Sequence, residues 1–440
     1  MPLPSLSPDL LDRILTFLPD FRTLSAFIRT SKNLYSVFQA RPKSIVKAIT
    51  QNASGDPNII PAAVRLAYVL PGRGYKRKED NGDDALPKER EVAELPLTRA
   101  ICEALVYHAP VVKELEDIFS WIKKDRTSRT SKLTVDESSR FRRAMYRFWL
   151  YCELYREPPD EDWYTFPRRV FFQALPLEEL LELGRAADFC AELLLRTDNS
   201  CGCASSLVPT VTYFRDISAM GPARVLWIFQ SLEPQEPEDV EEGFFWYPFF
   251  LNLIHHQMSP KIGHEALLEA ILSEVTGSQD ECDRCHAACG INLWGPSNWD
   301  LLRGIFCPTF LGTFYPNNLQ MNNTEVNLLL DYLSDVKSRF RNYITFDYAQ
   351  FMEEIVELHD EEAWSRDGWY CLECVSDLLR ERFVWWWLEK KQKAGIRIPL
   401  KACAWGYDCC LQGSDWYHAR TMNHLCRPTR RLMSPIHLNE

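Results

Sequence analysis

The strongest constraint on the fold is a set of paired cysteines and histidines near the C-terminal end. Cys403 and Cys409 have five residues between them, as do His418 and His424, and eight residues separate the two pairs. Close pairs of thiolate and imidazole ligands joined by a short loop can converge on one tetrahedral zinc ion. Gly406, inside the first pair, permits the tight turn that such a loop needs. The sequence therefore predicts that these four residues bind zinc.

The other cysteines leave the ligand set open. The chain has 15 cysteines and begins without a basic, apolar leader, so we expect a cytoplasmic or nuclear protein with reduced thiols. Cys371 and Cys374 form another close pair, which either binds metal or is buried at the start of a helix. With Cys410 and Cys426 this pair would complete a second set of four. The alternatives are therefore one zinc with mixed ligands or two zinc ions, with Cys371, Cys374 and Cys426 as further candidate ligands.

A cluster of three cysteines and one histidine lies earlier in the chain. On one straight helix, Cys282, Cys285, His286 and Cys289 would span roughly 10 Å, too far to share an ion bound to sulfur at about 2.3 Å. A bent loop near Gly290 could bring them together. Because free cysteine usually behaves as a small core hydrophobe, we expect buried thiols here.

The first fifty residues predict three short helices. Ser7 is a good N-cap, Pro8 suits the first helical position, and Ser31 can cap the third helix. So small a module cannot bury all of its apolar side chains, so part of this surface should face a partner or the rest of the chain. The first helix carries one apolar stripe, made of Leu10, Leu11, Ile14, Leu15 and Leu18.

The segment Leu6–Pro19, followed by Leu24 and by Thr30–Tyr35, resembles an F-box over about residues 4–48. The family often has Trp near the position of Leu34. The resemblance implies that these helices dock on the Skp adaptor of a cullin–RING ubiquitin ligase. The alternative is a helical hairpin packed on the chain's own core. The positions that the resemblance assigns to the adaptor contact are Leu6, Pro8, Leu11, Ile14, Leu15, Leu18 and Leu24.

The segment Cys403-Ala-Trp-Gly-Tyr-Asp-Cys409, with His418 and His424, resembles the aprataxin-and-PNK-like (PBZ-type) zinc finger. The resemblance implies the same four zinc ligands and poly(ADP-ribose) binding. The sequence departs from the family at Cys410-Leu411, where a Tyr-Arg pair that helps to hold the polymer is common. The combination of an F-box, a helical middle and a C-terminal Cys/His region resembles a type of fungal protein.

Helical patterns dominate the rest of the chain. Phe141, Met145, Phe148 and Cys152 follow helical spacing behind a capping box at Thr134–Glu137. The prediction is a mainly α protein in four parts. These are an F-box-like three-helix module (4–48), a charged flexible linker (71–97), an all-helical domain (98–365) and a small zinc-binding module (366–432).

The charge distribution and the absence of common catalytic motifs limit the classes of function that the sequence allows. The net charge is −11, yet residues 1–50 and 389–440 are both basic, which suggests that the two ends have their own partners. The sequence has no P-loop, dinucleotide fingerprint, Gly-x-Ser-x-Gly elbow or His-Glu-x-x-His motif, and no apolar run long enough to cross a membrane. We therefore expect a non-catalytic adaptor that binds the Skp adaptor, cullin subunits and a substrate protein. The alternative is a zinc-dependent module that binds poly(ADP-ribose) or nucleic acid.

Overall fold

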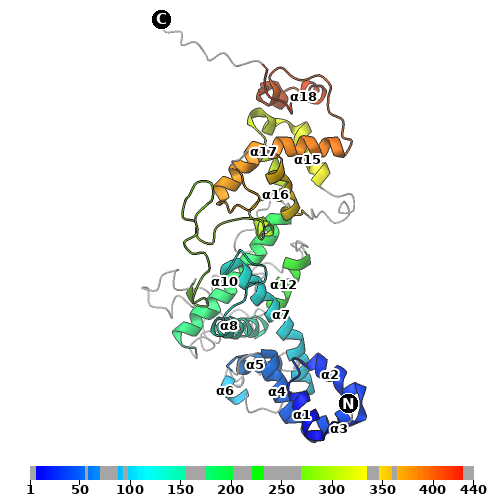
Figure 1. Ribbon diagram of the computed structural model, residues 1–440, viewed down its shortest axis with the longest axis vertical. Coiled ribbons are helices and arrows are strands. Elements are labelled where there is room, and N and C mark those ends of the chain that lie inside the picture. The colour runs from blue at the N-terminus through cyan, green and yellow to red at the C-terminus, as the bar shows by residue number, and fades with distance from the viewer. Residues whose placement is uncertain are drawn as a thin grey trace, which may run out of the picture.

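The computed structural model describes residues 6–54, 58–69, 88–92, 98–154, 175–201, 221–231, 269–333, 346–358 and 364–429. Over these ranges the chain is mainly helical, and its β-type pairings are isolated bridges, which confirms the mainly α fold class. None of the described helices is both long and apolar enough to cross a bilayer. Figure 1 shows three groups of helices along the long axis of the molecule.

The N-terminal group contains the predicted helices and continues beyond them. Ser7 accepts a hydrogen bond from Leu10 N at 3.5 Å, and Ser31 accepts one from Asn33 N at 3.2 Å, so both predicted caps are present. Two further helices follow directly and pack on the central group. The helices are α1 (Pro8–Thr16), α2 (Phe21–Thr30), α3 (Lys32–Ala40), α4 (Pro42–Ser54) and α5 (Ile60–Val69).

Most of the predicted linker, 71–97, lies outside the described residues. Residues 88–92 are described, and there the prediction of a flexible linker is wrong. They include the short helix α6 (Glu89–Val92), in which Val92 is buried. Glu89 receives two hydrogen bonds of 2.8 Å from Arg147, and this partly buried ion pair ties α6 to the central helices.

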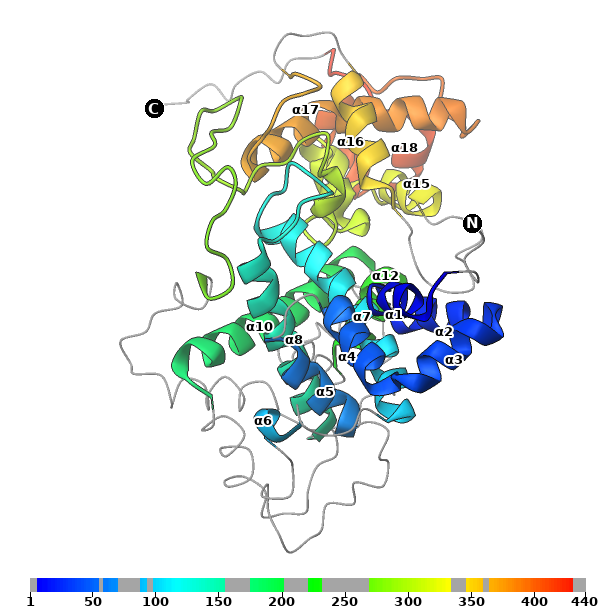
Figure 2. The same cartoon turned by 60° about the horizontal axis from the view of Figure 1, so that its bottom comes forward.

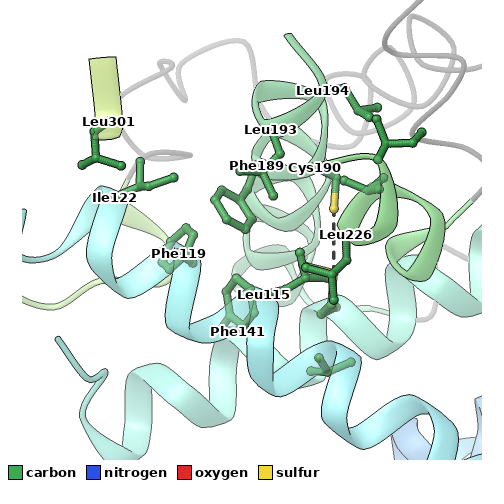
Figure 3. Packing of buried hydrophobic residues seen from close by; sticks show 14 of the residues in the cluster. Leu115, Phe119, Ile122, Phe141, Phe189, Cys190, Leu193, Leu194, Leu226 and Leu301 are labelled. Carbon is green, nitrogen blue, oxygen red and sulfur yellow. Dashed lines mark hydrogen bonds between the residues drawn. The ribbon is translucent and has the colours of Figure 1, made fainter. Parts of the chain in front are cut away.

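The central group is a helical bundle around an aromatic core. Phe119 lies 4.8 Å from Phe141 and 5.1 Å from Phe189 between ring centroids, so three helices meet at one point. Figure 3 shows these rings beside Cys190 and Leu226. Pro110 lies inside one continuous helix. The bundle comprises α7 (Arg99–Lys123), α8 (Val135–Leu154), α10 (Leu177–Cys201) and α12 (Pro222–Ser231).

A segment without α-helix or extended strand, which we call the strap (residues 272–298), connects this bundle to the C-terminal group. It is yellow-green in Figures 1 and 2. The predicted capping box holds one end of it. Thr134 N donates to Glu137 Oε2 at 2.9 Å, while Glu137 Oε1 accepts from Ser273 N at 2.9 Å. Lys124 also pairs with this carboxylate. The cap of α8 therefore anchors the strap as well.

The C-terminal group starts well before residue 366, the predicted boundary of the zinc-binding module. The 3₁₀ turns and helices that precede this boundary pack on the helices that follow it. Lys391, fully buried, pairs with Glu325 at 2.9 Å and joins the two sides. The elements are η4 (Trp299–Leu302), η5 (Pro308–Phe314), η6 (Asn317–Met321), α15 (Asn323–Leu333), α16 (Tyr348–Glu357), α17 (Leu372–Lys393), η8 (Gly406–Asp408), η9 (Cys410–Gly413) and α18 (Trp416–Thr421).

Candidate metal centres

The structure brings the four predicted ligands Cys403, Cys409, His418 and His424 together. Their ligand atoms all lie within 4.8 Å of one another, so this group could hold a metal ion. Cys409 Sγ is 3.3 Å and Cys403 Sγ is 3.7 Å from His418 Nε2, and the two imidazole rings are 5.0 Å apart between centroids. We call this group the finger centre, and the segment 401–427 that carries it the finger.

Local backbone structure positions each of these ligands. Cys403 N donates to Asn423 O at 2.9 Å, which places Cys403 beside His424 although the two lie far apart in sequence. Gly406 turns the chain at φ +48° between the two cysteines, as the sequence predicts. Asp415 accepts a hydrogen bond from His418 N at 2.9 Å and so starts α18, the helix that presents His418.

His424 is a buried histidine whose ring nitrogens would gain a partner if a metal ion were bound. It is 1% exposed, and neither ring nitrogen has a hydrogen-bond partner of good geometry within the described chain. Burial, with a smaller contribution from His418, lowers the pKa of His424 to about 4, so its ring is neutral near pH 7. A neutral imidazole with a free nitrogen lone pair is the form that binds metal, so the donor set fits an ion.

A second group could also hold a metal ion, and it includes Cys371 and Cys374, which the sequence left as candidate ligands. Cys282, Cys285, Cys371 and Cys374 place their sulfur atoms within 4.8 Å of one another. We predicted that Cys282 and Cys285 are simply buried thiols, but Cys285 is exposed and both cysteines lie in a bent loop. His286, at φ +57°, marks the bend. We call this group the four-cysteine centre.

Backbone N–H groups surround the Cys282 sulfur. Cys371 N lies 3.3 Å from it, and the N–H groups of Arg284 and Cys285 also favour its charged form. Burial opposes ionisation of this thiol, but these hydrogen bonds prevail and lower the pKa of Cys282 to about 7. On the other side, Cys371 is the N-cap residue of α17 and Cys374 lies in its first turn. Burial and the neighbouring thiols raise the pKa of both of these cysteines, so the four sulfurs compete for charge in the absence of a metal ion.

The remaining candidates lie outside both groups of four. Cys426 Sγ is 3.5 Å from Asn423 O and 3.8 Å from Cys403 O, and it is not part of either group. Cys410 is exposed. His286 and Cys289 follow the Cys282–Cys285 pair but do not join it. The pairing of Cys371 and Cys374 with Cys410 and Cys426 is therefore wrong for the described structure.

The predicted adaptor-contact residues divide into two sets. Leu11 and Leu15 are fully buried and, with Leu18 and Leu24, belong to the core of the N-terminal group rather than to its surface. Leu6 and Ile14 are half-buried, and Pro8 is exposed. Leu10, which belongs to the predicted apolar stripe but not to the predicted adaptor contacts, is 50% exposed, and Phe17, which belongs to neither set, is 72% exposed.

Comparisons with known proteins add no identity. No family model, no curated protein and no solved structure matches this chain.

Proposed function

We propose that this protein is a non-catalytic, substrate-recognition adaptor of a Skp–cullin–F-box ubiquitin ligase in the cytoplasm or nucleus. The N-terminal helices would bind the Skp adaptor and the C-terminal group would bind the substrate protein, while ubiquitin transfer would take place on partner subunits. The observation that best supports this proposal is a second apolar face on α1.

Helix α1 and the two residues that follow it carry two neighbouring apolar stripes. Leu11, Leu15 and Leu18 form the inner stripe and are buried. Leu10, Ile14 and Phe17 repeat the same spacing one residue earlier, and they form an outer stripe whose two ends are largely exposed. A short helix that is apolar on two sides buries one in its own core and offers the other to a partner.

The test is co-purification of the full chain with a purified Skp adaptor. Leu10→Asp combined with Phe17→Asp should weaken binding by roughly tenfold or more, because charges would replace central apolar contacts. Since both side chains are exposed, the variant should remain folded. Phe310→Asp, a similar change at a 55% exposed residue of the C-terminal group, is the matched control. Equal capture of all three proteins would refute the proposal.

Zinc is our proposed ion for the finger centre. Thiolate and imidazole donors in a closed set of four are typical of structural zinc sites. Elemental analysis of the purified protein should detect zinc, and the Cys403→Ser, Cys409→Ser variant should lose one equivalent. A folded protein that contains another metal, or no metal, at this centre would contradict the assignment.

A second candidate function is binding of poly(ADP-ribose) or nucleic acid by the finger. The supporting observation is an exposed aromatic and basic face on α18. Trp416 and Tyr417 are 64% and 71% exposed, and the Arg420 guanidinium lies 5.1 Å from the Trp416 ring centroid. Such binding should weaken steeply with salt and with Trp416→Ala, because it would depend on released counterions and base stacking. Absence of binding at low salt would exclude this candidate.

A further inference from the structure

We propose that the four-cysteine centre is a second zinc site, and that its zinc clamps the strap to α17 and so fixes the C-terminal group on the central helices. The observation that carries this inference is the convergence of two Cys-x-x-Cys pairs from distant parts of the sequence. The clamp stands independently of the adaptor proposal. Only its consequence for the distance between adaptor and substrate depends on that proposal.

The sulfur geometry fits a tetrahedral metal rather than a disulfide. Cys285 Sγ and Cys371 Sγ are 3.8 Å apart, and tetrahedral zinc with bonds of about 2.3 Å separates its sulfur ligands by about 3.8 Å. A disulfide would need about 2.05 Å. The four sulfurs belong to free cysteines that form one group. Four thiolates in this arrangement select zinc or iron, and zinc is the usual ion where the site is structural.

The loop that carries Cys282 and Cys285 is shaped around this group. His286 N donates to Cys282 O at 2.8 Å and Cys282 N donates to Ala287 O at 2.9 Å, which closes a tight turn. Gly290 completes the turn at φ +53°, where a Cβ would approach Ser278 O to 2.8 Å. A turn that directs two sulfurs toward the same point is the usual way in which a loop supplies half of a zinc site.

Other contacts also join the loop to α17 and to the segment that leads into it. Trp369 N donates to Asp283 Oδ2 at 2.6 Å, and the Arg284 guanidinium lies 3.8 Å from the Trp364 ring centroid. Asp283 N donates to Trp369 O at 2.9 Å, and Trp294 and Tyr370 form a two-bond bridge. Arg284 pairs with Glu381 at 3.1 Å, but both side chains are partly exposed, so this pair adds little stability. Zinc binding of roughly 10–16 kcal/mol in apparent free energy would far exceed these contacts.

The other side of the strap is attached to the central helices. Thr276 N donates to Lys124 O at 2.8 Å, just after α7 ends, and Ser297 Oγ donates to Thr127 O at 2.6 Å. Arg129 pairs with Asp300 immediately after the strap. The strap therefore touches the central bundle on one side and α17 on the other, and the four-cysteine centre is its attachment to α17.

Metal content of the full-length protein tests the site directly. The wild type should contain about two zinc ions per chain, one for each closed set of four ligands. The Cys282→Ser, Cys285→Ser variant and the Cys403→Ser, Cys409→Ser variant should each lose one ion. Cys307→Ser, which changes a free cysteine outside both centres, should lose none. Unchanged zinc in the Cys282→Ser, Cys285→Ser variant, iron in place of zinc, or a disulfide among the four thiols would overturn the proposal.

Hydrogen exchange tests the clamp. Loss of zinc from the four-cysteine centre should speed exchange at the strap amides of Asp283 and Trp294, while Cys403 and Asn423 in the finger remain protected. The Cys403→Ser, Cys409→Ser variant should show the opposite pattern. Equal protection of the strap with and without its zinc would refute the clamp.

If the serine variants do not fold, the site can be tested in the wild-type protein by replacing its metal with cobalt and recording the absorption spectrum. A four-thiolate centre gives stronger sulfur-to-cobalt charge-transfer absorption than a centre with two thiolates. We expect both spectral signatures in one protein, and absence of the four-thiolate signature would overturn the site.

Discussion

Replacement of Gly406 by alanine should break the finger centre without touching a ligand. Gly406 has φ +48°, and a Cβ at this position would lie 2.0 Å from Cys426 O and 2.9 Å from the backbone carbon of Arg427. The opposing carbonyl cannot move away freely, because Cys426 O accepts a hydrogen bond from Tyr407 N at 3.1 Å within the same turn. The clash is therefore with the backbone of Cys426 and Arg427.

The loss of stability in Gly406→Ala has two parts, one from backbone conformation and one from steric overlap. A left-handed conformation costs an alanine roughly 1–2 kcal/mol, and overpacking adds roughly 1–3 kcal/mol. Gly395 provides the control for the first cost. It has φ +65°, and a Cβ there would meet nothing within 4 Å. Gly406→Ala should therefore destabilise the metal-bound finger by about 1–3 kcal/mol more than Gly395→Ala does. This corresponds to a roughly 5- to 150-fold lower metal affinity.

The assay is zinc competition by a chelator, followed through hydrogen exchange at the finger amides of Cys403 and Asn423. These amides bond within the finger, to Asn423 O and Lys401 O respectively, so they report on this centre rather than on the four-cysteine centre. Gly406→Ala should expose them at much lower chelator concentration than either the wild type or Gly395→Ala. Equal behaviour of the two alanine variants would show that the close approach at Gly406 does not govern the site.

Three further predictions concern buried polar groups. Burial lowers the pKa of His108 to about 4, so wild-type stability should rise with pH between about 4 and 6.5 and then level off, because the unfolded chain binds the extra proton in that window. In His108→Phe, the rise in the free energy of unfolding over this pH range should be smaller by up to about 3 kcal/mol. Parallel plots of unfolding free energy against pH for the two proteins would contradict this prediction. Glu137→Gln should cost about 2–4 kcal/mol in the free energy of unfolding and speed exchange at Ser273 N, since it removes the charge that Lys124 and the strap share; unchanged exchange there would exclude a role in anchoring. Lys391→Met should cost about 3–5 kcal/mol in denaturant unfolding because it leaves Glu325 buried and unpaired, and the added change of Glu325 to Leu should recover part of that loss. A more severe effect of the double variant would refute this reading.

The sequence predicted the finger because everything needed for it is local. Its ligands fall within one short segment, and Gly406 marks the turn between the first two. It did not predict the four-cysteine centre because that centre depends on tertiary structure, with Cys285 and Cys371 separated by 86 positions. One signal was available: Cys282–Cys285 and Cys371–Cys374 share the same two-residue spacing, which is typical of paired zinc ligands. We left a bent loop near Gly290 open but expected buried thiols, because free cysteine usually behaves as a core hydrophobe. His286 and Gly290 do bend the chain there.

The N-terminal helices show a different limit. Apolar spacing correctly predicted α1 and its caps, but spacing alone does not say whether a stripe faces the chain's own core or a partner. Leu11 and Leu10 are both apolar and adjacent, yet one is fully buried and the other is half exposed. Which face of α1 is buried is set by α3 and α4, the helices on which α1 packs.

The two centres should also contribute to folding in different ways. Closing the chain between Cys409 and His418 spans 9 positions, and closing it between Cys285 and Cys371 spans 86. The entropy of loop closure makes the longer step costlier by about 2 kcal/mol, so metal favours the finger in the unfolded chain. We therefore expect the two cysteine pairs of the four-cysteine centre to meet after the central bundle has ordered the strap through Lys124 and Glu137. Metal can therefore organise the finger early, whereas at the four-cysteine centre it secures an arrangement that helix packing has already produced.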